Sequence, residues 1–90
     1  MGVKVEITWK RRSADGSRVE VNARRVGAEW RFYCRSRRFE KWEPFALPPL
    51  EDWLELLDAV ERRAARRLHR PAEVEQLRAT IHRRFPEAAL

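Results

Sequence analysis

Arginine alternates with apolar or aromatic residues along the segment EWRFYCRSR, residues 29–37. A period of two is typical of a half-buried strand whose charged residues all lie on one face. A guanidinium group can make two parallel hydrogen bonds to a phosphate or a base edge, so such a face could bind nucleic acid. The same pattern is also typical of a strand whose charged face is only solvated.

The segments 3–10 (VKVEITWK) and 18–24 (RVEVNAR) alternate in the same way and extend the charged face. Their basic residues, Lys10 among them, would neutralise phosphates, while Asn22 and Tyr33 would contact sugars or base edges. The candidate nucleic-acid-binding residues are Lys10, Arg12, Arg18, Asn22, Arg31, Tyr33, Arg35, Arg37 and Arg38.

Two turns predict how these strands pair. Between the first two strands, the loop 14–16 ends in glycine, which favours a type I turn followed by a bulge and pairs Ser13 with Ser17. This register sets Trp9 opposite Val21, so the apolar faces of the two strands coincide.

The second turn, Gly27-Ala28, has glycine first, as a type II′ hairpin turn requires, and it pairs Val26 with Glu29. Glu20 then lies opposite Arg35. The three segments are therefore predicted to form an antiparallel meander.

Cross-strand ion pairs provide the alternative interpretation of the charged face. In the predicted register Glu6 lies opposite Arg24, and Glu20 lies between Lys10 and Arg35. If these pairs satisfy the charges, the face needs no ligand.

The segment 39–45 (FEKWEPF) is either a short edge strand or an extended linker, because Pro44 cannot donate a backbone hydrogen bond. Residues 46–49 (ALPP) form a linker. Two amphipathic helices are predicted beyond it, from Leu50 to about Arg70 and from about Ala72 to Phe85. The apolar stripe of the first helix comprises Leu50, Trp53, Leu54, Leu57, Val60, Ala64 and Leu68.

The predicted fold class is α+β, in the order βββ(β)αα. Residues 1–90 are predicted to form a single domain, with the sheet in 3–45 and a two-helix hairpin in 50–86. The helices are expected to cover the apolar face of the sheet.

Charge is unevenly distributed along a chain whose net charge is +6. Residues 1–41 hold twelve lysines and arginines and five acidic residues, whereas residues 42–90 hold eight and nine, so the halves carry +7 and −1. A basic half favours a polyanionic partner. A further group of arginines, more typical of a helix end, comprises Arg62, Arg63, Arg66, Arg67, Arg70, Arg83 and Arg84.

A single cysteine, Cys34, excludes an intrachain disulfide and favours a cytoplasmic location. No apolar run approaches the length of a membrane span, so no membrane partner is expected. No phosphate-binding loop, nucleophile elbow or metal motif is present, and His69 and His82 are poorly placed to share a metal. The sequence therefore predicts neither an enzyme nor a cofactor.

A basic sheet backed by helix is similar to small domains at the N-termini of some tyrosine recombinases, which lay a sheet into the DNA major groove. The similarity is one of architecture, without a shared motif. Sheets that bind RNA typically display several stacking aromatics, whereas this face offers Tyr33 alone. The predicted function is nucleic-acid binding, with DNA favoured over RNA. The alternative is a protein-interaction or accessory domain, including a homodimer, whose basic face is only solvated.

Overall fold

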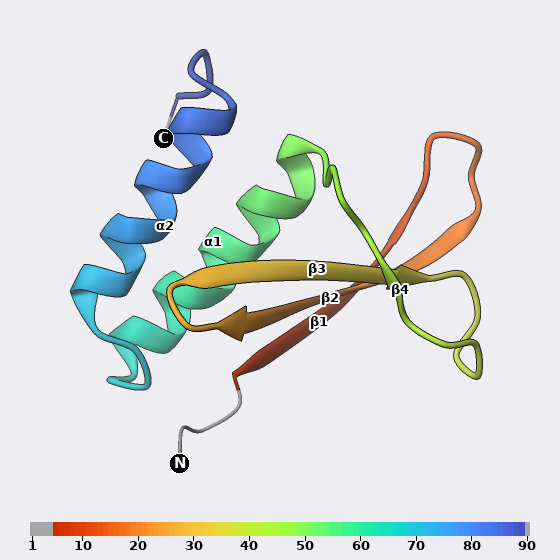
Figure 1. Cartoon of the computed structure of the whole chain (residues 1–90), viewed down its shortest axis with the longest axis horizontal. Coiled ribbons are helices and arrows are strands. Elements are labelled where there is room, and N and C mark those ends of the chain that lie inside the picture. Colours follow the sequence, from red (N-terminus) through yellow and green to blue (C-terminus); the bar gives the residue numbers. More distant parts are fainter. Residues whose placement is uncertain (1–4, 90) are drawn as a thin grey trace. The chain divides into compact units, whose positions relative to one another are not determined.

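The computed structural model describes residues 5–89, so Val3 and Lys4 of the first predicted strand lie outside the described residues. The elements follow the order β1 (Glu6–Arg12), β2 (Arg18–Val26), β3 (Glu29–Arg35), β4 (Glu43–Pro44), α1 (Leu50–Ala65) and α2 (Pro71–Arg84). The predicted α+β order βββ(β)αα is confirmed (Figure 1). The chain divides into two compact units, Met1–Pro48 with the sheet and Pro49–Leu90 with the helices.

The four strands lie in the order β1-β2-β3-β4, and every neighbouring pair is antiparallel. The predicted register is confirmed in both hairpins. Trp9 lies opposite Val21 in the first hairpin, and Glu20 lies opposite Arg35 in the second. Most apolar strand residues therefore share one face of the sheet, and most charged and polar residues share the other. The exceptions are Arg11 and Arg25 on the apolar face and Val26 on the charged face.

Both hairpin turns have the predicted geometry. The amide of Gly16 donates to the Ser13 carbonyl (2.9 Å), and the amide of Ser13 donates to the Ser17 carbonyl (2.8 Å). Gly16 and Gly27 have φ angles of +86° and +63°, which L-residues with side chains rarely adopt. These two glycines thus determine which side chains reach each face.

The segment 39–45, for which the sequence allowed either an edge strand or an extended linker, contains a short edge strand. β4 pairs Pro44 with Tyr33 and Glu43 with Cys34, and the Phe45 amide donates to the Phe32 carbonyl (2.9 Å). Proline is tolerated at this position because β4 lies at the edge of the sheet.

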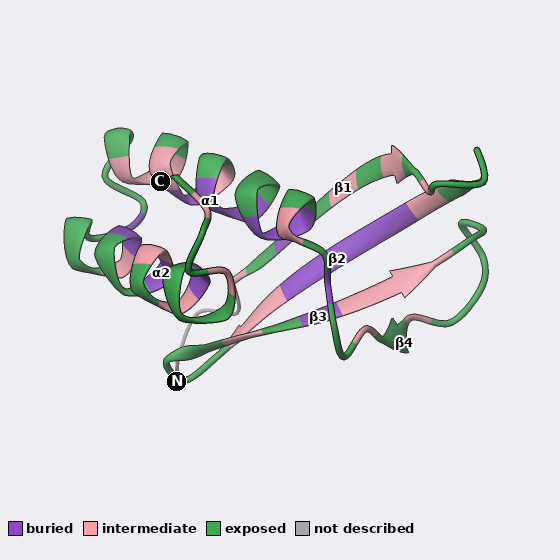
Figure 2. Cartoon of the chain, turned by 90° about the horizontal axis from the view of Figure 1, so that it is seen from above, coloured by how far each residue is buried: buried purple, intermediate pink, exposed green. Residues whose placement is uncertain are grey.

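Burial in the sheet unit is concentrated along β2, as Figure 2 shows. Val21 and Ala23 on the apolar face are buried, and so are Glu20 and Asn22 on the polar face. A central strand has neighbours on both sides, so even its polar side chains are enclosed by those of the adjoining strands.

The first helix ends earlier than predicted, at Ala65 instead of about Arg70. The amide of Arg67 donates to Ala64 (2.9 Å) and that of Leu68 donates to Arg63 (2.8 Å), which is the Schellman arrangement of a helix C-terminus. Arg67 adopts the left-handed conformation, φ 62°, that glycine usually supplies there. Leu68, predicted to lie on the apolar stripe, falls beyond the helix and is 65% exposed.

The apolar stripe of α1 is also rotated from its predicted position. Leu56 is completely buried although the prediction omitted it, whereas Leu54 is 39% exposed. The buried face passes through Trp53, Leu57 and Val60 as predicted. The buried face also includes Leu56, which lies on the same side of the helix as Val60 because the two residues are four positions apart.

The helices α1 and α2 form an antiparallel hairpin. The Arg78 guanidinium binds the Glu61 carboxylate (2.8 Å), and the Arg84 guanidinium lies 5.1 Å from the centroid of the Trp53 ring. Trp53 is near the start of α1 and Arg84 is at the end of α2, so the helices run in opposite directions. How the hairpin meets the sheet stays a prediction.

The second helix begins one residue before its predicted start, with Pro71 in its first turn. Proline is favourable at this position because its missing N–H would have no partner within the helix. In the part of the chain that the structure describes, neither helix is long and apolar enough to cross a membrane.

Candidate nucleic-acid interface

The nine candidate residues belong to two groups that differ in exposure. Asn22 is buried, and Tyr33 and Arg35 are half-buried among neighbouring side chains. The other six are all exposed and are called here the exposed cations: Lys10, Arg12, Arg18, Arg31, Arg37 and Arg38.

Asn22 lies on the polar face but does not present a free amide. Its Nδ2 donates to Glu6 Oε1 (2.8 Å) and to Thr8 Oγ1 (2.9 Å), and its Oδ1 accepts a hydrogen bond from Arg24 Nε (2.8 Å). With no exposed area, the amide cannot reach a base edge unless these bonds break. Asn22 therefore acts as a link between β1 and β2 and not as a surface contact.

Tyr33 is covered on one ring face by Arg24, whose guanidinium lies 4.4 Å from the ring centroid. Arg24 Nε also lies 3.6 Å from Glu6 Oε1, so this predicted cross-strand ion pair is confirmed. The two contacts hold Arg24 in place and leave Tyr33 less of its ring for stacking.

Arg35 is held by the second confirmed ion pair, in which its Nε lies 2.9 Å from Glu20 Oε2. Its guanidinium lies 4.1 Å from the centroid of the Trp42 ring, so Trp42 packs over the charged face of β3. Strand alternation does not predict the side on which Trp42 lies, because the residue precedes β4. Arg35 is thus mainly a structural residue.

The exposed cations, in contrast, have no carboxylate within ion-pair distance among residues 5–89. Arg12 and Arg18 lie directly opposite each other at one end of the β1–β2 hairpin. Arg12 Nη1 donates to the Gly16 carbonyl (3.0 Å), which is a neutral partner. Two opposed guanidinium groups repel each other unless water or an anion lies between them.

Arg37 and Arg38 do not continue the strand. β3 ends at Arg35, and the Glu40 amide donates to the Arg37 carbonyl (3.1 Å), which closes a turn over residues 37–40. Arg37 is therefore not part of the strand that the alternation over residues 29–37 predicted. It lies instead in the β3–β4 loop, beside Arg38 and Phe39.

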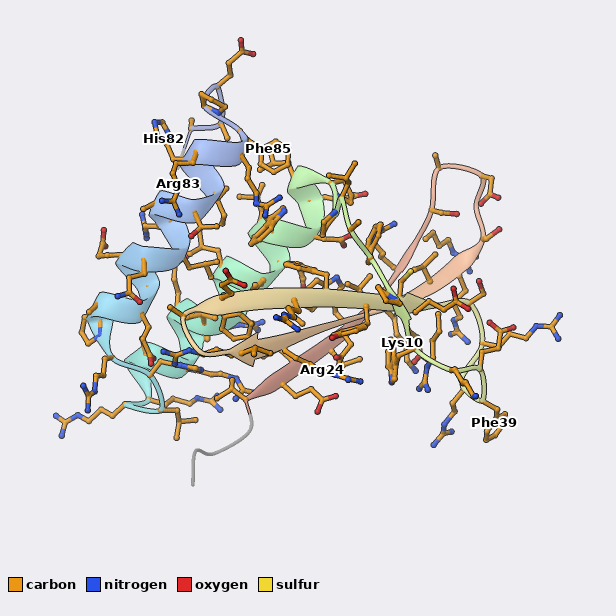
Figure 3. All side chains as sticks on the ribbon, viewed as in Figure 1. Lys10, Arg24, Phe39, His82, Arg83 and Phe85 are labelled. Carbon is orange, nitrogen blue, oxygen red and sulfur yellow. The ribbon has the colours of Figure 1, made fainter. Side chains whose placement is uncertain are left out.

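Phe39 was not among the predicted site residues, yet it is 95% exposed at the tip of this loop. Figure 3 shows the ring pointing away from the strands. The sequence contained one signal for it, because Phe39 follows two arginines and has no alternating apolar neighbour.

One acidic group lies in the loop between Arg12 and Arg18. Asp15 Oδ1 accepts a hydrogen bond from the Ser13 hydroxyl and another from the Ser17 amide (2.9 Å). These hydrogen bonds, the Ser13 bond first, lower the pKa of the Asp15 carboxyl to about 2. Its charge is therefore present at neutral pH and offsets part of the local positive charge.

The contacts of His69 indicate a structural role at the start of α2. His69 is buried, and its Nδ1 lies 2.7 Å from Glu73 Oε2, which also accepts a hydrogen bond from the Arg70 amide at the start of α2 (3.0 Å). Within residues 5–89, no three His, Cys, Asp or Glu side chains gather in a group that could hold a metal ion. The exposed cations of the sheet unit are therefore the groups that could bind a ligand, and that ligand would be an anion.

Comparison with protein-family models, curated protein sequences and solved structures found no match for this chain.

Proposed function

We propose that this chain is a small, non-enzymatic nucleic-acid-binding protein of the cytoplasm that contacts phosphates through the exposed cations of its sheet unit. The observation that carries the proposal is that all six exposed cations lack an ion-pair partner among residues 5–89. Such groups are available to displace counterions from a phosphate backbone.

Charge segregation between the two units supports this choice of surface. Residues 5–48 hold eleven lysines and arginines and six acidic residues, a net of +5. Residues 49–89 hold eight of each and are neutral. A polyanion is therefore attracted to the sheet unit more strongly than to the helices.

The experiment compares two triple variants that remove the same charge. In one, Arg18, Arg37 and Arg38 of the sheet unit are replaced by alanine; in the other, Arg66, Arg70 and Arg83 of the helical unit are replaced. Affinity for labelled duplex DNA, duplex RNA and single strands is measured by fluorescence anisotropy. We expect the first variant to lose about 10- to 100-fold in affinity and the second to lose little.

Equal losses in both variants would show that only net charge matters, and a larger loss in the second would place the binding surface on the helices. Because all six arginines are exposed, neither variant is expected to unfold the protein. Circular dichroism of both variants checks this.

A protein-interaction domain is the second candidate, and one observation favours it. The seven-residue strand β1 lies at an edge of the sheet, where backbone groups can pair with another strand. Sedimentation velocity at moderate salt distinguishes the two functions. A stable dimer without nucleic-acid affinity would support the second candidate and refute the first.

A further inference from the structure

Phe39 is the most exposed large apolar residue within residues 5–89, with 95% of its surface accessible, compared with 82% for Leu47. An aromatic ring left in water loses the stabilisation that burial would give it. The ring therefore contributes little to the stability of the fold. A ligand that covers the ring would be stabilised by the burial of this apolar surface.

The backbone of the loop fixes the direction of this ring. Because the Glu40 amide donates to the Arg37 carbonyl, Arg38 and Phe39 occupy the two central positions of a β-turn. Side chains at these positions project from the tip of a turn. Figure 3 shows Phe39 doing so at the end of the loop farthest from the strands.

The loop is also braced where it leaves the sheet. Arg35 is held by Glu20 (2.9 Å), donates from Nη1 to the Glu40 carbonyl (3.4 Å) and lies under the Trp42 ring (4.1 Å). These contacts come from both ends of the loop and restrict its movement. A ring that is already positioned loses less conformational entropy when a ligand binds.

The charges beside Phe39 indicate the kind of ligand. Arg37, Arg38 and Lys41 are exposed around it, and Glu40 is the one acid within the loop. A purely apolar partner would have to cover these cations without pairing them, at a cost in desolvation. Nucleic acid instead offers an apolar base face next to phosphates.

Single strands fit the ring better than duplexes do. In a duplex each base face is already covered by its neighbours, whereas an unpaired base can stack on an aromatic side chain. We propose that Phe39 stacks on a base of single-stranded nucleic acid while Arg37, Arg38 and Lys41 contact the flanking phosphates. This inference rests on the proposed function and adds the class of ligand.

The test uses two oligonucleotides of about ten nucleotides that differ only in their bases: one of thymidine and one of abasic sites. Both carry the same phosphates, so the ratio of their affinities isolates the contribution of the bases. The unmodified protein is compared with Phe39→Ala, with the aromatic replacement Phe39→Tyr and with Leu47→Ala, which removes another exposed apolar side chain of the same unit.

We expect the unmodified protein to bind the thymidine strand about 5- to 150-fold more tightly than the abasic strand. Phe39→Ala should remove this preference and leave the affinity for the abasic strand unchanged, while Phe39→Tyr and Leu47→Ala should keep it.

Equal affinity for both strands would overturn the stacking role and leave phosphate binding by the exposed cations intact. A base preference that survives in Phe39→Ala would assign the stacking to another residue and refute this one. Absence of binding to either strand would refute this inference, and absence of binding to duplex DNA and duplex RNA as well would refute the proposed function. If Phe39→Ala instead lost affinity for vesicles of anionic phospholipid and kept its affinity for both strands, the ring would be a membrane contact and the proposal would be wrong.

Discussion

Arginines on the charged face of the sheet differ in what their side chains do. Arg24 and Arg35 each lie against an aromatic ring and a glutamate, so they join neighbouring strands. Arg18 and Arg31 are exposed and have no such partner among residues 5–89. Exposure and pairing together distinguish a structural arginine from one that is available to a ligand.

Asn22 gives the sharpest prediction at this scale, because it was expected to contact a ligand and is instead buried with three hydrogen bonds. Asn22→Ala should lower the free energy of unfolding by about 1–3 kcal/mol, since it leaves polar neighbours unsatisfied. Urea unfolding measures this. Ser36→Ala, at an exposed position, should change it by less than about 0.5 kcal/mol.

Nucleic-acid affinity of folded Asn22→Ala should remain close to that of the unmodified protein. A large loss of affinity with unchanged stability would restore the direct contact that the sequence predicted.

Asp15 predicts a dependence of stability on pH. Its pKa is lowered to about 2 in the folded protein, so the folded state favours the ionised carboxylate. The resulting stabilisation is fully present above the ordinary aspartate pKa of 3.8 and is lost as pH falls from there toward about 2.

Replacing Asp15 with asparagine removes this titration. The difference in free energy of unfolding between the two proteins should be constant above about pH 5 and should change as pH falls through about 4 to 2. Urea unfolding at several pH values measures it. A difference that does not vary with pH would mean that the Ser13 and Ser17 hydrogen bonds do not favour the charged form.

At the scale of elements, the strands could be predicted from sequence more fully than the helices. Gly16 and Gly27 each stand where a turn needs a positive φ, and together with strand alternation they determine the register of both hairpins. The end of α1 carries no such signal, because Arg67 occupies the position where glycine would be recognised. Side-chain contacts such as Trp42 on Arg35 depend on where a non-alternating loop returns, so alternation could not predict them.

Arg67 leads to a prediction about the helix end. Glycine adopts φ 62° without the steric cost that a side chain imposes, so Arg67→Gly should raise the free energy of unfolding by about 1 kcal/mol. Arg66→Gly is the matched control, because Arg66 has φ −94° and loses the same charge without relief of strain. If both variants changed stability equally, the left-handed conformation at Arg67 would not be costly.

At the scale of the whole molecule, the chain carries its excess positive charge in one unit. The sheet unit is basic, and the confirmed register of β1, β2 and β3 places Lys10, Arg12, Arg18 and Arg31 on one face, while Arg37 and Arg38 lie in the β3–β4 loop. The helical unit has as many acidic as basic residues in 49–89, and its apolar side chains Leu77 and Ile81 are buried. Binding of a polyanion by the sheet unit is therefore the central claim.

The dependence of affinity on salt tests this claim most directly. For a thymidine oligonucleotide we expect the logarithm of the association constant to fall with the logarithm of salt concentration with a slope of about −3 to −4, as four to six phosphate contacts require. Replacing Arg18, Arg37 and Arg38 with alanine should make the slope shallower by about 2. A slope near zero, or the same slope in that variant, would contradict the account.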